Sequence, residues 1–572
     1  MRLQPIFDIA GICSRKGIKD AIVCPGSRCA PLTLAFARHP DIQTRTISDE
    51  RSAGFIALGI AQQTKRTVVL ICTSGTAAYN FAPAVAEAYY QRIPLLVLTA
   101  DRPTEWIGQW DGQTISQQNI YGNHVKRSYH LPQEYDHPDS KWWIQRSINE
   151  AVNLTQEGFH GPVHVNVPLR EPLYPPAGEA ITYSDDIRIT ERLTTRVALP
   201  PKSLQQLSVQ LDQSKRVLVV GGQGPLSVNL VAALNSLATL GDVVVVGDVI
   251  SNLHALPSVI RYADIFLTPM DGKATDLQPD LLITIGQSVI SKNLKLFLRA
   301  NKPAAHWHVD ESAGQIVDPF QSITTLIPQN PEDLFATLAK SAKGNPERKQ
   351  YVERWSTVDQ KTSEAVKEFF GNETSGELSF VDQVMHELPD HTSLHVANSM
   401  AVRYANFCGL GDNKKGVQVY SNRGTSGIDG CTSTAMGHAL SSDTIHTLIT
   451  GDVAFFYDRN AFWNNYDAPN LRVIVLNNHG GAIFGMIDGP TSQPEVDEYF
   501  VTRQPLTAKH LADEFGLTYH RVTNNDNAAV VLEDFFKPGS RSKILEFESG
   551  SKEAKELFLR FKENVKRKID QV

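Results

Sequence analysis

The sequence is poor in cysteine and lacks the spacing of a zinc site. It has only six cysteines in 572 residues, and no two of them form a CxxC pair. This scarcity excludes a disulfide-stabilised scaffold and argues against a structural zinc site. Cys24 and Cys29 are the most closely spaced pair, and we predict that both are buried thiols.

An excess of basic charge and long apolar runs are also absent. Lys and Arg number 55 against 62 Asp and Glu, which gives a formal net charge of −7 and argues against a protein that coats nucleic acid. The longest apolar runs, such as residues 94–100, are strand-sized and far shorter than the roughly 20 residues of a membrane-spanning helix. Residues 1–17 hold no apolar run of secretory length. We therefore expect a cytoplasmic protein without membrane insertion and without a nucleic-acid partner.

The chain is long enough for several domains. At roughly 150 residues per domain the length predicts three or four units, and 41% hydrophobic residues suffice for large cores. In the first 170 residues, short apolar runs alternate with helical patterns. Strands are expected at residues 20–24, 43–47, 67–72 and 94–100, and helices at 30–38, 51–64 and 76–90. This alternation predicts right-handed βαβ units and a parallel sheet covered on both faces.

Two polar stretches rich in proline or glycine, residues 172–203 and 341–350, divide the chain. Between them we expect strands at residues 216–220, 243–246 and 281–285 and a helix at 227–240. After them the pattern of the first unit returns, with strands at residues 393–396, 417–420, 446–449 and 472–476. The last 22 residues predict a basic amphipathic helix on the solvated surface. The predicted fold class is α/β, with three doubly wound parallel-sheet domains at residues 1–180, 190–342 and 350–572.

The strongest chemical signal follows two consecutive strands of the third unit. Asp452 follows one strand and Asn478 the next, with a helix expected at residues 454–465 between them. Because the carboxyl ends of parallel strands meet at one sheet edge, the two side chains should lie close together. A carboxylate, an amide oxygen and the Gly480 carbonyl suit Mg²⁺, which is often shared with phosphates. The spacing predicts a site for Mg²⁺ and a diphosphate group; the alternative is a helix N-cap and an ordinary turn.

Several motifs carry a family resemblance. Gly451-Asp452 followed by Asn477-Asn478 resembles the signature of thiamine-diphosphate-dependent enzymes, with Val453 in place of the usual second glycine. Further motifs occur in one order, namely CPGSR at 24–28, SDER at 48–51, TSGT at 73–76, TADRP at 99–103, SNRGTSGIDG at 421–430 and NNHGG at 477–481. Together they closely resemble the 2-succinyl-5-enolpyruvyl-6-hydroxy-3-cyclohexene-1-carboxylate synthase family of menaquinone biosynthesis, over essentially the whole chain.

The resemblance implies a thiamine diphosphate site with Mg²⁺, or alternatively Mn²⁺, held by Asp452, Asn478 and the Gly480 carbonyl. Glu50 is the implied catalytic residue, because its carboxyl group would favour the imino tautomer of the aminopyrimidine ring, which then takes the thiazolium C2 proton. Without the resemblance, Glu50 is a helix-capping residue. Ile428 is implied to bend the two cofactor rings together. The implied cofactor-binding residues are Glu50, Thr76, Ile428, Gly451, Asp452, Val453, Ala454, Asn478 and Ile483.

The implied substrates, 2-oxoglutarate and isochorismate, are dianions that need cations in their pocket. The implied substrate-binding residues are Ser27, Arg28, Arg102, Gln113, Lys292, Ser399, Arg403, Arg423 and Phe484. Asn293 and Gly112 depart from the family pattern, in which Arg and Asn are often found. Viewed singly, the arginines are equally typical of surface residues paired with acids.

The implied reaction decarboxylates 2-oxoglutarate and adds the remaining four-carbon unit to isochorismate in a 1,4-addition. Because the first and last domains must face each other, we expect a homodimer or homotetramer with shared active sites. Three alternatives remain: another thiamine enzyme, such as a 2-oxoacid decarboxylase or acetolactate synthase; a nicotinamide or flavin oxidoreductase that uses the GGQG turn at 221–224; and a non-catalytic nucleotide-sensing module. We expect the middle domain to keep a nucleotide-type fold without a cofactor.

Overall fold

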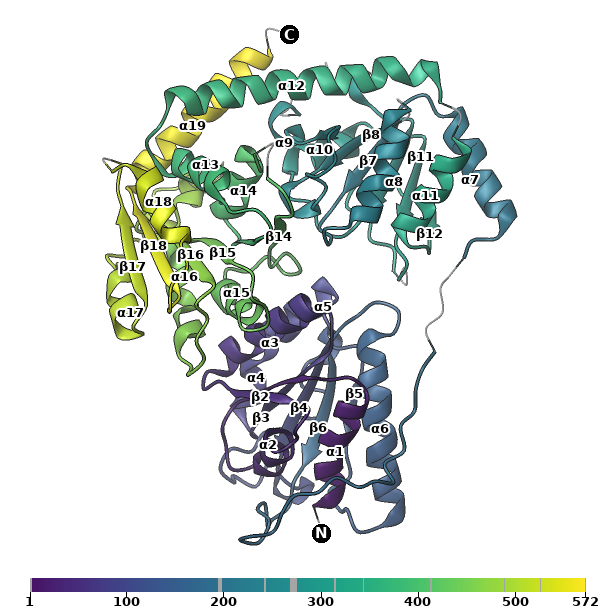
Figure 1. The fold of residues 1–572 in the computed structure, drawn as a ribbon, viewed down its shortest axis with the longest axis vertical. Helices are drawn as coiled ribbons and strands as arrows, with labels where there is room; N and C mark the ends of the chain where they lie inside the picture. Colours follow the sequence, from purple (N-terminus) through teal and green to yellow (C-terminus); the bar gives the residue numbers. More distant parts are fainter. Residues whose placement is uncertain are drawn as a thin grey trace.

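Three parallel sheets, each flanked by helices, form the molecule (Figure 1). The computed structural model describes residues 3–193, 198–240, 243–267, 275–312, 315–342, 344–411, 414–487, 489–524 and 526–570. Each sheet has six strands, and every pair of neighbouring strands in these residues is parallel. The predicted α/β class with three doubly wound sheets is confirmed.

The first sheet has the strand order β2-β1-β3-β4-β6-β5. Its strands are β1 Asp20–Val23, β2 Gln43–Thr46, β3 Val68–Cys72, β4 Leu95–Asp101, β5 Ser128–His130 and β6 Val163–Pro168. Its helices are α1 Gln4–Arg15, α2 Ala30–Ala37, α3 Glu50–Thr64, α4 Thr76–Asn80, α5 Ala82–Gln91 and α6 Pro138–Gln156. The single helix expected at 76–90 is wrong: Pro83, in the first turn of α5, has no N–H with which to continue α4, so the helix breaks at Phe81. Cys24 and Cys29 are buried free thiols, as predicted.

The middle sheet has the order β12-β11-β10-β7-β8-β9. Its strands are β7 Val217–Gly221, β8 Val244–Gly247, β9 Val259–Ile260, β10 Leu281–Ile285, β11 Ala305–Val309 and β12 Thr325–Ile327. Its helices are α7 Pro201–Gln213, α8 Val228–Thr239, α9 Ala263–Phe266, α10 Lys292–Ala300 and α11 Pro331–Ser341. Read from β9, this is the order 3-2-1-4-5-6 of dinucleotide-binding folds, which confirms the predicted nucleotide-type topology.

The glycine-rich turn after β7 is packed against other parts of the chain. A Cβ atom on Gly222 would lie 2.2 Å from the carbonyl oxygen of Gln287. The Gln223 side-chain amide donates a hydrogen bond to the Ser421 carbonyl of the third domain, at 2.7 Å. The close backbone approach that glycine permits here therefore serves contacts within the protein.

The third sheet repeats the order of the first, as β14-β13-β15-β16-β18-β17. Its strands are β13 Ser393–Val396, β14 Gln418–Tyr420, β15 His446–Gly451, β16 Leu471–Asn477, β17 Thr518–Val522 and β18 Lys543–Glu548. Its helices are α12 Lys349–Asn372, α13 Glu377–Glu387, α14 Met400–Cys408, α15 Cys431–Ala439, α16 Asp452–Tyr457, α17 Ala508–Glu514, α18 Ala528–Phe536 and α19 Ser551–Ile569. The expected similarity of the first and last domains is thus a shared topology.

One expectation for this domain needs correction. The helix expected at 454–465 ends at Tyr457 and is followed by a separate 3-10 turn, and Asp458 between them accepts hydrogen bonds from the N–H and hydroxyl groups of Ser433, both at 2.7 Å. The amphipathic helix predicted at the C-terminal end of the sequence is confirmed as α19. Its apolar face is buried, its polar face is exposed, and it lies beside the long helix α12 that spans the middle and third domains (Figure 1).

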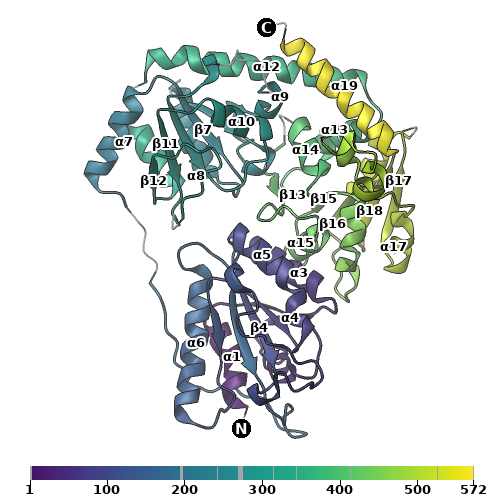
Figure 2. The same cartoon turned by 180° about the vertical axis from the view of Figure 1, so that it is seen from behind.

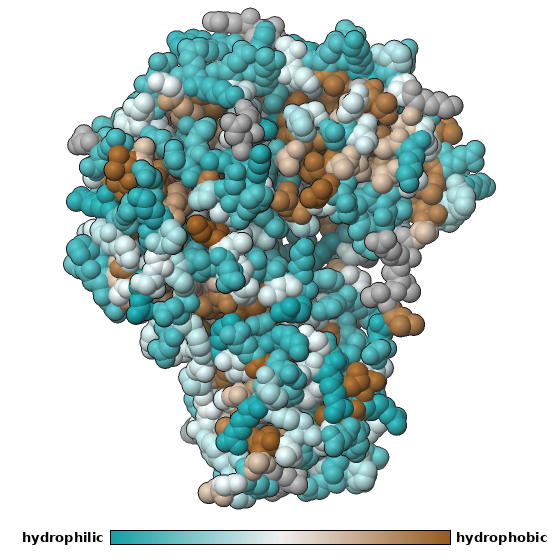
Figure 3. Space-filling view, in the orientation of Figure 1, coloured by the Kyte–Doolittle hydropathy of each residue, from teal (hydrophilic) through white to brown (hydrophobic). Residues whose placement is uncertain are grey.

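The first domain contacts the third through α3 and α15, which cross at two glycines. A Cβ on Gly59 would lie 2.2 Å from the Thr434 carbonyl oxygen, and one on Gly437 would lie 2.2 Å from that of Ile56. After β6, the described residues 169–193 follow the outside of the first domain (Figure 2). They are held there, since the Tyr183 hydroxyl donates to the Ala35 carbonyl at 2.7 Å. The face in Figure 3 is largely hydrophilic, with apolar residues in scattered groups.

Among the described helices, none combines the length and the apolar character needed to cross a bilayer.

Candidate active site

Asp452 and Asn478 lie at the same edge of the third sheet, as their spacing predicts. They follow β15 and β16, which are parallel neighbours with Gly451 in register with Leu476. Asp452 is the first residue of α16 and is 1% exposed, while Asn478 is 7% exposed. Two oxygen-bearing side chains are therefore buried beyond the carboxyl ends of adjacent strands, where α/β sheets bind ligands.

Asp452 has a partner that the sequence did not indicate. The side-chain amide of Gln504 donates to Asp452 Oδ2 at 2.6 Å and to Asn477 Oδ1 at 3.2 Å. Burial raises the pKa of Asp452 to about 6, although hydrogen bonds from Gln504 and from the Val453 and Gly480 N–H groups oppose the rise. The cost of burying this carboxylate favours a positive charge beside it.

Asn478 presents an oxygen without a partner. Its Nδ2 donates to Glu377 Oε2 at 2.9 Å, whereas its Oδ1 is buried and accepts no hydrogen bond from the described residues. Burial raises the pKa of Glu377 to about 7; the hydrogen bond from Asn478 opposes the rise, and the charge of Asp452 adds to it. An orphaned amide oxygen beside a carboxylate fits the hard oxygen ligands of Mg²⁺.

Gly480 occupies a position that only glycine accommodates. Its φ is +154°, and a Cβ there would lie 2.8 Å from the Val501 carbonyl oxygen. Its own carbonyl accepts a hydrogen bond from the Ala482 N–H at 3.0 Å, which leaves one lone pair for another partner. The Asp452, Asn478 and Gly480 set thus supplies three types of oxygen at one sheet edge.

Glu50 lies in a cavity of the first domain. It is half-buried at the start of α3, and the helix cap is Asp49, whose Oδ1 accepts from the N–H groups of Arg51 and Ser52. Asp49 and not Glu50 is therefore the N-cap, while Glu50 is the acidic residue in the first turn of α3. The cavity has a volume of about 430 Å³ and is lined by Pro25, Glu50, Thr73, Ser74, Gly75, Thr76, Ala77, Asn80, Asp111, Gln113, Thr114 and Ile115. It brings together Glu50, Thr76 and Gln113.

All residues that line this cavity belong to the first domain. None comes from the edge of the third sheet that carries Asp452. In the described part of a single chain, the cavity that holds Glu50 is thus built without the oxygen ligands.

The two candidate arginines of the first domain are anchored by protein groups. Arg28 is buried, and its guanidinium donates to the Leu169 carbonyl at 2.9 Å. Arg102 donates to the Gly112 carbonyl at 2.9 Å and forms an ion pair with Asp111 at 3.2 Å. The Arg102 contacts hold the turn that carries Gln113, whose φ is +54°. Ser27 is exposed beside Arg28.

Ser399, Arg403 and Arg423 lie together in the third domain. Arg403 donates to the Ser399 carbonyl at 2.5 Å, and Arg423 donates to Asn398 Oδ1 at 2.9 Å. Burial lowers the pKa of both arginines, and the charge of Arg403 lowers that of Arg423 further. Two half-buried guanidinium groups in mutual repulsion form an environment that favours an anion.

The middle domain places a second lysine near the expected Lys292. Lys292 is exposed at the start of α10, whereas Lys295 is half-buried and donates to the Val289 carbonyl at 2.9 Å. Burial lowers the pKa of Lys295, and the charge of Arg423 lowers it further. Lys295 therefore adds positive charge near Arg423. The only sign of Lys295 in the sequence is its position three residues after Lys292, which places both lysines on the same side of a helix.

The remaining candidate residues lie on turns at the same edge of the third sheet. Ile428 is half-buried between β14 and α15, and Ile483 and Phe484 are half-buried in the turn after β16. Gly451, Val453 and Ala454 flank Asp452, where β15 passes into α16.

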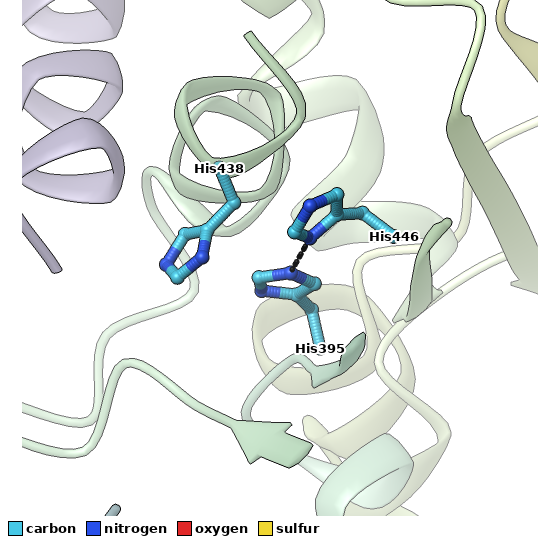
Figure 4. Close-up of side chains that lie close together, drawn as sticks. All are labelled: His395, His438 and His446. Atoms are coloured by element: carbon cyan, nitrogen blue, oxygen red, sulfur yellow. Dashed lines mark hydrogen bonds between the residues drawn. The ribbon is translucent and has the colours of Figure 1, made fainter. Parts of the chain in front are cut away.

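A cluster of three buried histidines lies elsewhere in the third domain (Figure 4). His395 on β13 and His446 on β15 share a hydrogen bond of 3.1 Å between ring nitrogens, and His438 on α15 faces them. Both nitrogens of His438 are bonded to side chains of α3, Gln62 and Gln63. Burial lowers the pKa of all three rings, which favours their neutral forms. His438 joins α15 to α3 through its two hydrogen bonds.

Comparisons with known proteins define the class first. The family model described as "Thiamine pyrophosphate enzyme, N-terminal TPP binding domain" matches residues 7–120, and the one described as "Middle domain of thiamine pyrophosphate" matches residues 193–396. With the three-sheet fold, these matches define a thiamine-pyrophosphate enzyme.

Three relatives share one printed name, 2-succinyl-5-enolpyruvyl-6-hydroxy-3-cyclohexene-1-carboxylate synthase. The protein of Cytophaga hutchinsonii is 45% identical, over 98% of this chain and 99% of its own. That of Flavobacterium johnsoniae is 36% identical over 94% of both chains, and that of Porphyromonas gingivalis is 37% identical over 93% of this chain and 92% of its own. The chain belongs to this synthase family and is a thiamine-diphosphate-dependent transferase.

Proposed function

We propose that this enzyme decarboxylates 2-oxoglutarate and adds the remaining four-carbon unit to isochorismate in a 1,4-addition. The products would be 2-succinyl-5-enolpyruvyl-6-hydroxy-3-cyclohexene-1-carboxylate and CO₂. The reaction would take place in the cytoplasm. The observation that carries this proposal is the similarity to synthases of one name along nearly the whole of both chains.

Asp452, Asn478 and the Gly480 carbonyl would hold Mg²⁺, or Mn²⁺ in its place. The unpartnered, buried Oδ1 of Asn478 supports this assignment. Gly451, Val453 and Ala454 would contact the diphosphate. When bound, thiamine diphosphate supplies the electron sink for loss of CO₂, which no amino-acid side chain offers.

Glu50 would act on the aminopyrimidine ring. A carboxyl group hydrogen-bonded to a ring nitrogen holds a proton there and favours the imino form of the exocyclic nitrogen, which is the form that accepts a proton. The position of Glu50 in a cavity supports this role, as does its carboxylate, which accepts no hydrogen bond from the other described residues. Thr76, Ile428 and Ile483 would hold the rings in place by contact.

The substrate carboxylates would meet the cations described above. Arg403 and Arg423, with Ser399 beside them, form a half-buried group, and guanidinium groups bind carboxylates with two parallel hydrogen bonds. Ser27, Arg28, Arg102, Gln113, Lys292 and Phe484 are the further proposed contacts. Exclusion of water from this site would strengthen each charge interaction.

The working enzyme would be a homodimer or homotetramer whose active sites are shared between chains. The cavity around Glu50 has no lining residue from the third domain, so a second chain would bring its Asp452 edge to this cavity.

A coupled assay tests the proposal. Purified protein with thiamine diphosphate and Mg²⁺ would receive 2-oxoglutarate with and without isochorismate, and the products would be identified by mass. We expect a product that combines both substrates, and loss of activity after chelation that added Mg²⁺ restores. Pyruvate turnover as the main activity would identify a different carboligase and refute the proposal.

A further inference from the structure

Glu377 is a buried acid that has no place in the predicted site. It is the first residue of α13 and is 1% exposed, and Gly376 precedes it with φ +96°. Its Oε2 accepts hydrogen bonds from Asn478 Nδ2 at 2.9 Å and from the Ser549 hydroxyl at 3.4 Å. In the sequence it lies 101 residues before Asn478.

The contact determines which way the Asn478 amide faces. A side-chain amide has an oxygen that accepts and a nitrogen that donates, while a carboxylate only accepts. The Glu377 carboxylate therefore pairs with Nδ2 and leaves Oδ1 on the other side of the amide, where it is buried and unpartnered. The backbone is fixed as well, since the Ser551 hydroxyl donates to the Asn478 carbonyl at 2.5 Å.

We propose that Glu377 is a positioning residue for the metal, which orients Asn478 so that Oδ1 faces the cation. This inference rests on the Mg²⁺ site of the proposed function. Without an acceptor at position 377, the amide is free to turn Nδ2 toward the cation, and an N–H group cannot ligate a metal. Outer partners that orient metal ligands typically change metal affinity by about 10–100-fold when removed.

Three variants test this role at about pH 8 in the presence of thiamine diphosphate. Glu377→Gln keeps the length and an acceptor oxygen, Glu377→Met keeps the length and removes the acceptor, and Glu387→Gln changes an exposed acid at the other end of α13. Mn²⁺ binding is measured by electron paramagnetic resonance, and thermal unfolding of each metal-free variant reports its fold. The steady-state rate at saturating Mn²⁺ is recorded separately.

We expect Glu377→Met to weaken Mn²⁺ binding at least tenfold, Glu377→Gln to stay within about threefold of the wild type, and Glu387→Gln to be unchanged. At saturating Mn²⁺ the Met variant should regain most of its rate, because the lesion concerns metal affinity.

Wild-type Mn²⁺ affinity in the Met variant would overturn the inference. So would a tenfold loss in the Gln variant, because the charge and not the hydrogen-bond acceptor would then matter. If the Met variant does not fold, the Mn²⁺ affinity of the Gln variant decides: a tenfold loss overturns the inference, and a change within about threefold supports it. A wild-type protein that binds neither Mn²⁺ nor thiamine diphosphate would instead refute the proposed function.

Discussion

The Glu87 carboxylate of the first domain accepts hydrogen bonds from the backbone N–H groups of Gly424 and Thr425 in the third, at 2.8 and 2.7 Å. Glu87 is 1% exposed, and the Thr425 hydroxyl also donates to it at 2.5 Å. The loop approaches α5 so closely that a Cβ on Gly424 would lie 2.9 Å from the Glu87 carbonyl oxygen. The first domain therefore holds the loop that presents Arg423.

Glu87→Gln should destabilise the protein and weaken substrate binding. The new amide would turn an N–H group toward one of the backbone N–H groups, and hydrogen bonds to a charged group contribute about 1.5–3 kcal/mol. We expect the free energy of unfolding to fall by about that amount, and KM for the anionic substrate to rise more than kcat falls. Urea unfolding and steady-state kinetics measure both, with the exposed Glu179→Gln as control. Equal stability of the two variants would contradict the prediction.

Gly59→Ala tests the crossing of α3 and α15. In an open helix this change stabilises by about 0.4–1 kcal/mol, but here the new Cβ would lie 2.2 Å from the Thr434 carbonyl oxygen. We expect a loss of about 1–3 kcal/mol from overpacking. The matched control is Gly371→Ala in α12, where a Cβ meets nothing within 4 Å. This control should leave the free energy of unfolding unchanged or raise it. If thermal or urea unfolding shows that both substitutions change the free energy of unfolding in the same direction, the two helices separate freely and the prediction is wrong.

Glu50→Gln should remove catalysis while leaving the cofactor bound. A glutamine cannot share a proton with the aminopyrimidine ring nitrogen as a carboxyl group does. A positioned proton-transfer group contributes about 10²–10⁴-fold in rate. We expect kcat to fall within that range and the thiamine diphosphate affinity, measured by calorimetry, to change little. Unchanged kcat would favour the non-catalytic alternative.

The histidine cluster predicts a stability loss in mild acid. Burial lowers the pKa of His446 to about 4, while an unfolded histidine titrates near 6.5. As the pH falls from about 6.5 to 4, His446 binds a proton in the unfolded chain but not in the folded chain. The free energy of unfolding therefore decreases, by about 3 kcal/mol for His446 at the limit. Above pH 7.5 the effect is absent.

The difference between wild type and His446→Gln isolates this contribution, because the buried carboxylates with raised pKa, such as Asp452, change the pH profile in the opposite sense in both proteins. Urea unfolding at pH 7.5 and at pH 5 should therefore give a shallower decline for the variant. Parallel declines would mean that His446 is not neutral in the fold.

The sequence predicted what is local or follows from strand connection. Strands β10 and β13 have the predicted bounds, and Asp452 and Asn478 meet because one βαβ crossover joins them. Contacts made across long stretches of chain, such as Glu377 with Asn478, left no periodic signal and were missed. Lys292 was selected by resemblance and lies exposed on α10, while Lys295, one helical turn later, is half-buried. The domain bounds and the roles of the site residues stay predictions.

The purely first-domain lining of the Glu50 cavity has a consequence for mixtures of mutants. With active sites assembled from two chains, a hybrid of Glu50→Gln and Asp452→Asn subunits carries both lesions in one site and none in the other. Co-expressing two dead variants should then regenerate up to half of the normal activity per hybrid, a complementation that a self-sufficient single chain could never display.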